Sequence, residues 1–325
     1  MRAAAWARGI NMTPDIFING ILPVFLLIAL GFGLKVSGFL PPSVWGPIER
    51  IAVYVFYPGF LIPAIWHADL SGLSAGPISL AVSTSLALSI LIAFALKPVL
   101  RLSGPTYTSV FQGLIRFNSF VFLPIATSIF GAQAVGLAAV AMSALIPLSN
   151  MASILVLARW GQPEGEDTVD RSFRGVMARL FTNPIFLSCL IGLALNMVRA
   201  PSVPFIEKDL KMLGDAAIPT GLILAGAGLN FAYIRSQPVL VVATSAFKVL
   251  IVPLISWGLC RLFGGDALAQ GVALCCGAAP CAAVAYVQAR HMGGDAPLMA
   301  GIVALTTSLS LISLPLLLWL YHLLT

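Results

Sequence analysis

Long apolar runs follow one another along almost the whole chain, and the short turns between them hold most of the charges. A helix that crosses a bilayer needs about 20 mostly apolar residues. The strands of a membrane β-barrel would instead give weakly alternating blocks of about ten residues. The runs therefore predict an all-α integral membrane protein. We expect ten membrane-spanning segments, at about residues 16–36, 48–66, 76–96, 112–131, 134–158, 181–198, 213–234, 239–263, 270–294 and 297–323.

The composition agrees with this class. Of 325 residues, 59% are hydrophobic and 9% charged, whereas soluble domains have about 25% charged residues. The 18 basic residues behind the net charge of +6 are spread among short loops, which favours a role in membrane topology. We expect a lipid bilayer, and no nucleic acid, as a partner. The five cysteines form no CxxC pair and only three histidines occur, so neither a metal site nor a disulfide framework is expected, and no cofactor is predicted.

Two polar stretches suggest the domain boundaries. Residues 1–15 read as an N-terminal tail and residues 159–179 as a cytoplasmic linker, which leaves five-helix repeats at 16–158 and 180–325. The first eleven residues resemble the start of a signal peptide but lack its apolar core and cleavage site. Ten Lys and Arg residues follow the odd-numbered segments, against six on the side of the termini. The positive-inside rule then places both termini outside the cytoplasm, in an inner (plasma) membrane.

One segment, 112–131, carries Arg116, Asn118 and Ser119 near its middle and then Pro124. Polar groups are costly in hydrocarbon unless they face protein, water or a ligand. Proline removes a backbone donor, so we expect this helix to bend or break at Pro124. The segment at 270–294 is interrupted in a similar way. Two interrupted segments in corresponding places indicate the substrate site of a secondary transporter.

The two halves also share an order of features. Gln112-Gly113 and Gln270-Gly271 open the interrupted segments, and a proline follows after 12 and 10 residues, respectively. Five helices per half make the second copy enter the bilayer from the opposite side, so we predict two inverted repeats. The alternative is a chance similarity between apolar sequences.

Four stretches carry a resemblance to a known family. They are RFNSFVFLP (Arg116–Pro124), DAAIPTGLILAGAGL (Asp215–Leu229), KVLIVPL (Lys248–Leu254) and APCAAVAYVQARHMGGDA (Ala279–Ala296). The chain resembles the auxin efflux carrier family, which includes bacterial malonate and malate permease-like carriers and the plant PIN-formed auxin carriers. The resemblance implies a fold similar to bile-acid sodium symporters, with broken, crossing helices four and nine. It also implies a scaffold of helices one, two, six and seven, a moving transport domain and a homodimer.

The same resemblance suggests site residues. Asn118 matches the asparagine of a Pro-Asn pair that helps hold the substrate carboxylate in the plant relatives, although Phe117 stands in place of the proline. Pro280 matches the proline of the second crossing helix. Cys281 replaces the polar amide that follows it, and Val284 stands near an asparagine common in bacterial members. The second half of the site is therefore less polar, which leaves the size and charge of the substrate open.

The chemistry of the first break suits an anion, because a broken helix exposes N–H groups and a positive dipole end. Asn118 adds an amide donor and Ser119 a hydroxyl, unless this pair only contacts neighbouring helices. Arg116 is either a counter-charge or a side chain that extends to the cytoplasmic surface. Pro280 and Cys281 would line the site mainly through their backbone.

Other polar residues are weaker candidates. Lys248 lies deep in its segment and either carries a proton or pairs with a carbonyl or carboxylate. Asp215 is a possible coupling or charge-pair residue, although an acid at a helix N-terminus also complements the dipole. Tyr286 and Gln288 lie beyond the second break and could line the path. Gly226 and Gly228 are expected to allow close helix packing.

These features favour a secondary transporter of small organic anions, either auxin-like or dicarboxylate, that works by elevator-type alternating access. No Walker motif is present in the sequence, so ATP is not the expected energy source. A sodium- or proton-coupled symporter of bile-acid-symporter type is the alternative, although no Asp or Glu lies near the centre of a segment. The absence of such a central acidic residue also disfavours a sodium/proton antiporter. An intramembrane enzyme is a remote alternative because paired catalytic groups are not evident, and a receptor would not need two broken helices.

Overall fold

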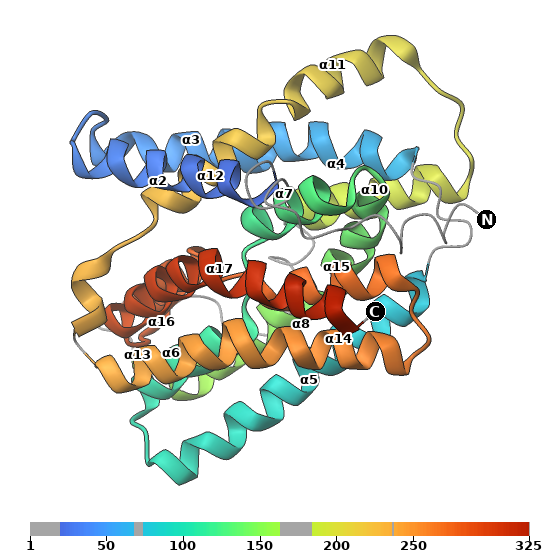
Figure 1. Ribbon diagram of the computed structural model, residues 1–325. Coiled ribbons are helices and arrows are strands. Elements are labelled where there is room, and N and C mark those ends of the chain that lie inside the picture. Colours follow the sequence, from blue (N-terminus) through green and yellow to red (C-terminus); the bar gives the residue numbers. More distant parts are fainter. Residues whose placement is uncertain (1–19, 68–73, 163–183, 236, 325) are drawn as a thin grey trace.

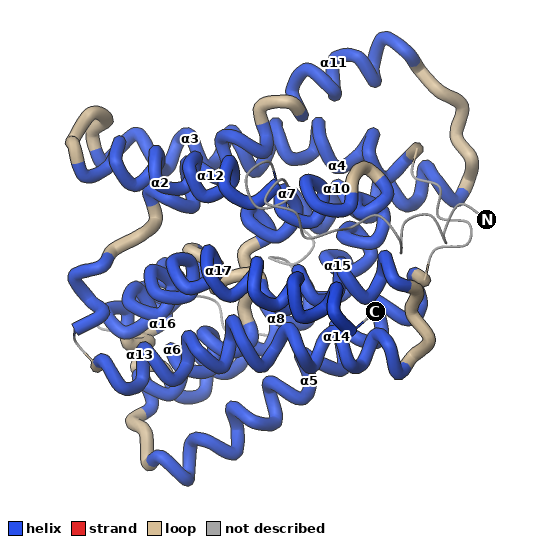
Figure 2. The backbone as a smooth tube through the Cα atoms, in the orientation of Figure 1, coloured by secondary structure: helices blue, strands red, loops and turns tan. Residues whose placement is uncertain are grey.

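The computed structural model describes residues 20–67, 74–162, 184–235 and 237–324, and every regular element in these ranges is helical (Figure 2). The first half contains α2 (Leu22–Val36), η2 (Pro42–Val44), α3 (Trp45–Ile51), η3 (Ala52–Phe56), α4 (Tyr57–Trp66), α5 (Ala75–Leu100), α6 (Gly104–Ile115), α7 (Ser119–Phe130) and α8 (Gln133–Trp160). The second half contains α10 (Pro184–Met197), α11 (Pro204–Gly214), α12 (Ala217–Ala227), η4 (Phe231–Arg235), α13 (Pro238–Ala246), η5 (Phe247–Ile251), α14 (Val252–Leu262), α15 (Ala267–Ala278), α16 (Val284–Met292) and α17 (Ala296–Leu324).

Seven helical stretches in the described ranges are long and apolar enough to cross a membrane. Three shorter apolar helices, α2, α10 and α15, add to them. These helices confirm the prediction of an all-α membrane protein. The predicted tail at 1–15 and most of the linker at 159–179 lie outside the described residues.

The helices form two groups (Figure 1). One group consists of α2, α3, α4, α10, α11 and α12, in which α2 packs on α12 and α4 packs on α10 and α11. The other contains α5, α6 and α13 to α17, in which α14 packs on both α5 and α15. Glycines permit the close approach of α2 and α12, because a Cβ at Gly31 or Gly226 would collide with the backbone of Ile223 or Ile28. The packing role predicted for Gly226 is confirmed.

Two helices are interrupted, and their breaks lie against each other. The first break separates α6 from α7 at residues 116–118, and the second separates α15 from α16 at residues 279–283. The backbone N–H of Asn118 donates to the carbonyl oxygen of Pro280 at 2.8 Å. A hydrogen bond between unwound segments satisfies backbone groups that neither helix can pair.

Two details of the sequence-based expectation are wrong. Pro124 lies inside α7 and the break precedes it, because neighbouring structure lets membrane helices tolerate proline. Residues 199–211, which fall in the connection between the segments expected at 181–198 and 213–234, include most of the helix α11. Pro204 begins it, and Lys211 follows Glu207 and Lys208 at spacings of four and three residues, so the polarity marks one face of a helix and not a loop.

Candidate functional site

A cavity of about 640 Å³ lies between the two groups of helices, at the level of the first break. Its walls come from α2, α3, α10 and α12 of the first group, from α8, and from α7 and α16 beside the breaks. The polar and charged side chains on its lining are Lys35, Glu49, Arg116, Asn118, Ser119, Ser149, Asn150, Tyr286 and Gln288. Five of the predicted site residues are therefore brought together here.

Asn118 combines two structural roles with a free donor. Its side-chain oxygen accepts a hydrogen bond from the backbone N–H of Phe120 at 3.0 Å, so it caps α7. Its backbone N–H is used by Pro280 across the breaks. The amide nitrogen carries two further N–H donors, and none of the hydrogen bonds found within the described ranges uses them. Asn118 thus presents donors to the cavity.

Arg116 is a buried charged group on the lining of the cavity. It is only 5% exposed and its Nη1 donates to Oε1 of Gln288 at 2.7 Å. The pairing joins the end of α6 to α16, and it shows that Arg116 does not extend to the surface. A guanidinium has five N–H donors, so one bond to Gln288 leaves donors for a ligand. No acid is paired with it among the described residues.

Each break is followed by a half-helix that begins at the cavity, α7 after the first break and α16 after the second. Ser119 and Phe120 at the start of α7 line it, and so do Ala282, Ala283 and Val284 at the start of α16. The first turn of a helix has N–H groups without intrahelical partners and carries a partial positive charge. Two such ends on one cavity, together with Arg116, form an environment that favours an anion.

Pro280 and Cys281 lie behind the cavity and do not line it. Both are buried. The backbone N–H of Cys281 donates to Oγ1 of Thr306 at 3.2 Å, and its thiol makes only long contacts, to the carbonyl oxygens of Gln112 at 3.8 Å and Ala282 at 4.0 Å. These residues hold the crossing together through their backbone, while the neighbouring Ala282 and Ala283 face the cavity.

The two predicted coupling or charge-pair residues are outside the cavity. Nζ of Lys248 lies 3.3 Å from the carbonyl oxygen of Gly277, so its partner is a carbonyl. Asp215 follows α11 on the exposed surface, where it forms an ion pair with Lys211 at 3.0 Å. An exposed pair of this kind contributes little stability, and the structure does not bring Asp215 near the breaks.

Several lining residues were missed by reading the sequence. Lys35 lies at the end of the first expected segment, where a basic residue indicates topology alone, whereas in the structure it lines the cavity and its Nζ lies 3.4 Å from the carbonyl oxygen of Leu229. Glu49 and Asn150 are not indicated by the sequence, because Glu49 stands at the edge of the expected segment at 48–66 and Asn150 is an isolated amide within the segment at 134–158. The charged residues on the lining are Lys35, Arg116 and Glu49. Two cations against one carboxylate leave one net positive charge.

The protein crosses the membrane several times and has a polar cavity between two groups of helices. Two half-helices begin at this cavity. This is the organisation of a membrane transport protein. Residues 16–318 match the family model described as "Membrane transport protein". The chain therefore belongs to this family, the auxin efflux carrier family that its sequence resembles. It is also similar to an uncharacterized transporter of Methanothermobacter thermautotrophicus, with 26% identity over 299 residues that cover 91% of this chain and 95% of the relative.

Proposed function

We propose that the protein is a secondary transporter of small organic anions, and that the cavity at the breaks is its substrate site. The observation that carries the proposal is Arg116, a buried cation with one neutral partner, in a cavity that two half-helix N-termini also face. A buried charge is costly unless it is compensated. A carboxylate in the cavity would supply that compensation and could accept two parallel hydrogen bonds from the guanidinium.

The lining favours a substrate with one carboxylate and an apolar body. The net positive charge of the cavity equals one, and Trp45, Phe117, Phe120 and Tyr286 supply aromatic surface. Apolar walls with a few placed polar groups are typical of small-molecule sites, and about 640 Å³ lies within their usual range. A dicarboxylate is the alternative, with Lys35 as the partner of the second carboxylate.

For the transport cycle we propose an elevator-type movement of one helix group against the other. The group around α2, α4, α10 and α12 would be the scaffold, and α5 to α8 with α13 to α17 would move with the breaks. Two inverted five-helix repeats, at 16–158 and 180–325, would build the ten spans. The support is the pair of matched breaks, at equivalent points of the two halves. A homodimer through the scaffold is part of this proposal.

We further propose that the cavity faces the cytoplasm in this conformation. Its lining includes Gly38, Leu40 and Pro41 in the turn after α2, and Gly228 after α12. Both turns belong to the side with the larger number of Lys and Arg residues, which the positive-inside rule assigns to the cytoplasm. Both termini would then lie outside, in the plasma membrane.

A binding screen tests the proposed substrate class. The purified carrier is heated with each of a series of mono- and dicarboxylates, and a ligand that binds the folded state raises the melting temperature. Uptake of the stabilising acid is then measured in proteoliposomes. An absence of stabilisation by any of these acids would contradict the proposal.

Asn118 gives the sharpest variant for this assay. Asn118→Ala removes the amide donors and the cap, and we expect substrate-dependent uptake to be lost while expression and folding persist. Asn118→Ser is the matched control, because serine caps a helix about as well as asparagine but has no amide. We expect Asn118→Ser to melt within about 2 °C of the wild type and to bind substrate about tenfold more weakly. Undiminished uptake by Asn118→Ala would exclude Asn118 from the site.

A further inference from the structure

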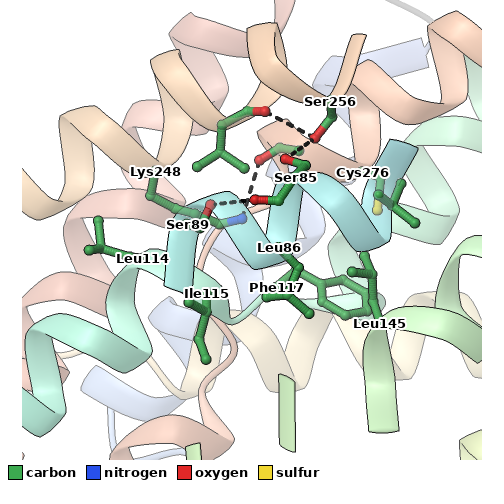
Figure 3. A pocket seen from close by; sticks show the side chains of 13 residues that line it. Ser85, Leu86, Ser89, Leu114, Ile115, Phe117, Leu145, Lys248, Ser256 and Cys276 are labelled. Carbon is green, nitrogen blue, oxygen red and sulfur yellow. Dashed lines mark hydrogen bonds between the residues drawn. The ribbon is translucent and has the colours of Figure 1, made fainter. Parts of the chain in front are cut away.

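A second, smaller crevice lies behind the breaks, and Lys248 ends in it (Figure 3). Its volume is about 20 Å³, enough for about one water molecule beside the ammonium. Phe117 lines both this crevice and the large cavity, so the two spaces are neighbours. Lys248 is 3% exposed, and its side chain extends from η5 toward the serines of α5 in Figure 3.

The break in the helix provides the main partner of the ammonium. In a continuous helix the carbonyl of Gly277 would accept from the N–H of Cys281, but that N–H donates to Oγ1 of Thr306. The freed carbonyl is 3.3 Å from Nζ of Lys248. It belongs to the last turn of α15, where the helix dipole is negative. Carbonyls at such half-helix ends are the groups that coordinate cations in transporters with broken helices.

The serines around Lys248 also present acceptors. The hydroxyl of Ser89 donates to the carbonyl of Ser85 at 2.9 Å, and the hydroxyl of Ser256 lies 3.0 Å from the carbonyl of Val252 and 2.9 Å from Oγ of Ser85. With the protons of Ser89 and Ser256 engaged, the oxygens of these hydroxyls keep lone pairs for the crevice, and Ser85, which can accept from Ser256, keeps a second lone pair. No Asp or Glu lines it. A set of neutral oxygens suits a monovalent cation and does not suit an anion.

We propose that these oxygens form a monovalent-cation site and that the Lys248 ammonium permanently occupies it. The carbonyl of Gly277 and the hydroxyls of Ser85, Ser89 and Ser256 would be the ligands, and the tethered ammonium compensates the end of α15. The carrier then needs no exchangeable sodium ion at this position. This last consequence rests on the proposed transport function, whereas the site itself does not.

The test is to remove the ammonium and supply sodium. Lys248→Ala vacates the site and keeps the oxygens, so sodium chloride should raise its melting temperature by about 2 °C or more over choline chloride at equal ionic strength. Wild type should melt at the same temperature in both salts. Lys248→Met is the matched control, because an apolar side chain of similar length fills the crevice without a charge. Its melting temperature should not respond to sodium.

Further outcomes decide the proposal. Adding Ser89→Ala to Lys248→Ala should reduce the sodium response at least twofold. An equal response to sodium in the wild type, or no response in Lys248→Ala, would overturn the assignment. If Lys248→Ala can be purified only in sodium, the site is supported; if it fails in both salts while Lys248→Met folds, the site is rejected. No organic acid is present in these measurements, so they are independent of the substrate screen.

Discussion

The two helix breaks differ in what they offer to the cavity. The first is three residues long and places the side chains of Arg116 and Asn118 on the lining. The second spans residues 279–283 and contributes the backbone beside Ala282 and Ala283, with Pro280 and Cys281 turned away. Both are followed by a half-helix whose N-terminus faces the cavity. The dipole contribution is thus shared, while the specific hydrogen bonds come from the first break.

The half-helices that precede the breaks differ in a related way. Each ends with a negative dipole pole inside the protein. At the end of α6 the cation is its own next residue, Arg116, whereas at the end of α15 it is Lys248, from a different helix. Arg116 faces the large cavity, and Lys248 faces a crevice of only about 20 Å³. Arg116 is therefore available to a ligand and Lys248 is not. We accordingly expect Arg116 to act in binding and Lys248 to support the structure.

The largest effect is expected for Arg116→Gln. This substitution removes the cation that would pair with the substrate carboxylate. Loss of one partner of such a buried charged pair costs about 2–5 kcal/mol of binding free energy. We expect the affinity for the stabilising acid to fall by about 30-fold or more, measured by isothermal titration calorimetry. Lys35→Gln is the matched control, because it removes a positive charge from an exposed part of the cavity lining. It should weaken binding of the acid by less than tenfold. Equal losses of affinity in the two variants would show that Arg116 contributes no more to binding than any other positive charge in the cavity.

An intermediate effect is expected for Thr306→Val, which addresses the second break. Thr306 is fully buried, accepts from the N–H of Cys281 and donates to the carbonyl of Ile302 at 2.7 Å. Valine has nearly the same shape but leaves the N–H of Cys281 buried without a partner, which costs about 1–3 kcal/mol. The melting temperature should fall by several degrees, with substrate affinity changed by less than threefold. A large loss of affinity at unchanged stability would show that the second break does contact the substrate.

The sequence predicted the helices well because hydrocarbon imposes a strong rule on length and polarity. The expected segment at 297–323 is observed as α17 at Ala296–Leu324, and 239–263 corresponds to α13, η5 and α14. The break at Pro280 was also expected. Such features are local, because a breaker or a buried polar residue marks its own position.

What could not be predicted depends on contacts between distant segments. Glu49 and Asn150 become lining residues only because α3 and α8, which are far apart in the sequence, both form walls of the cavity. The partner of Arg116 could not be identified, since Gln288 is 172 positions away. The first break was expected at Pro124 and lies before it, because a proline permits a kink in a helix without requiring one. The break lies instead where Asn118 can cap α7 and where its N–H can reach Pro280.

The smallest effect is expected at Cys281, and it separates backbone from side chain at the second break. The thiol is fully buried and its nearest polar contact is 3.8 Å from sulfur to oxygen, a weak interaction. Cys281→Ala keeps the N–H that Thr306 accepts, so substrate affinity should change by less than about twofold, and the loss of stability should be about 1 kcal/mol from the small cavity. Chemical unfolding and the same calorimetric titration measure both quantities. A loss of affinity as large as that of Asn118→Ser would show that the thiol side of the crossing takes part in binding, and the two breaks would then be functionally equivalent.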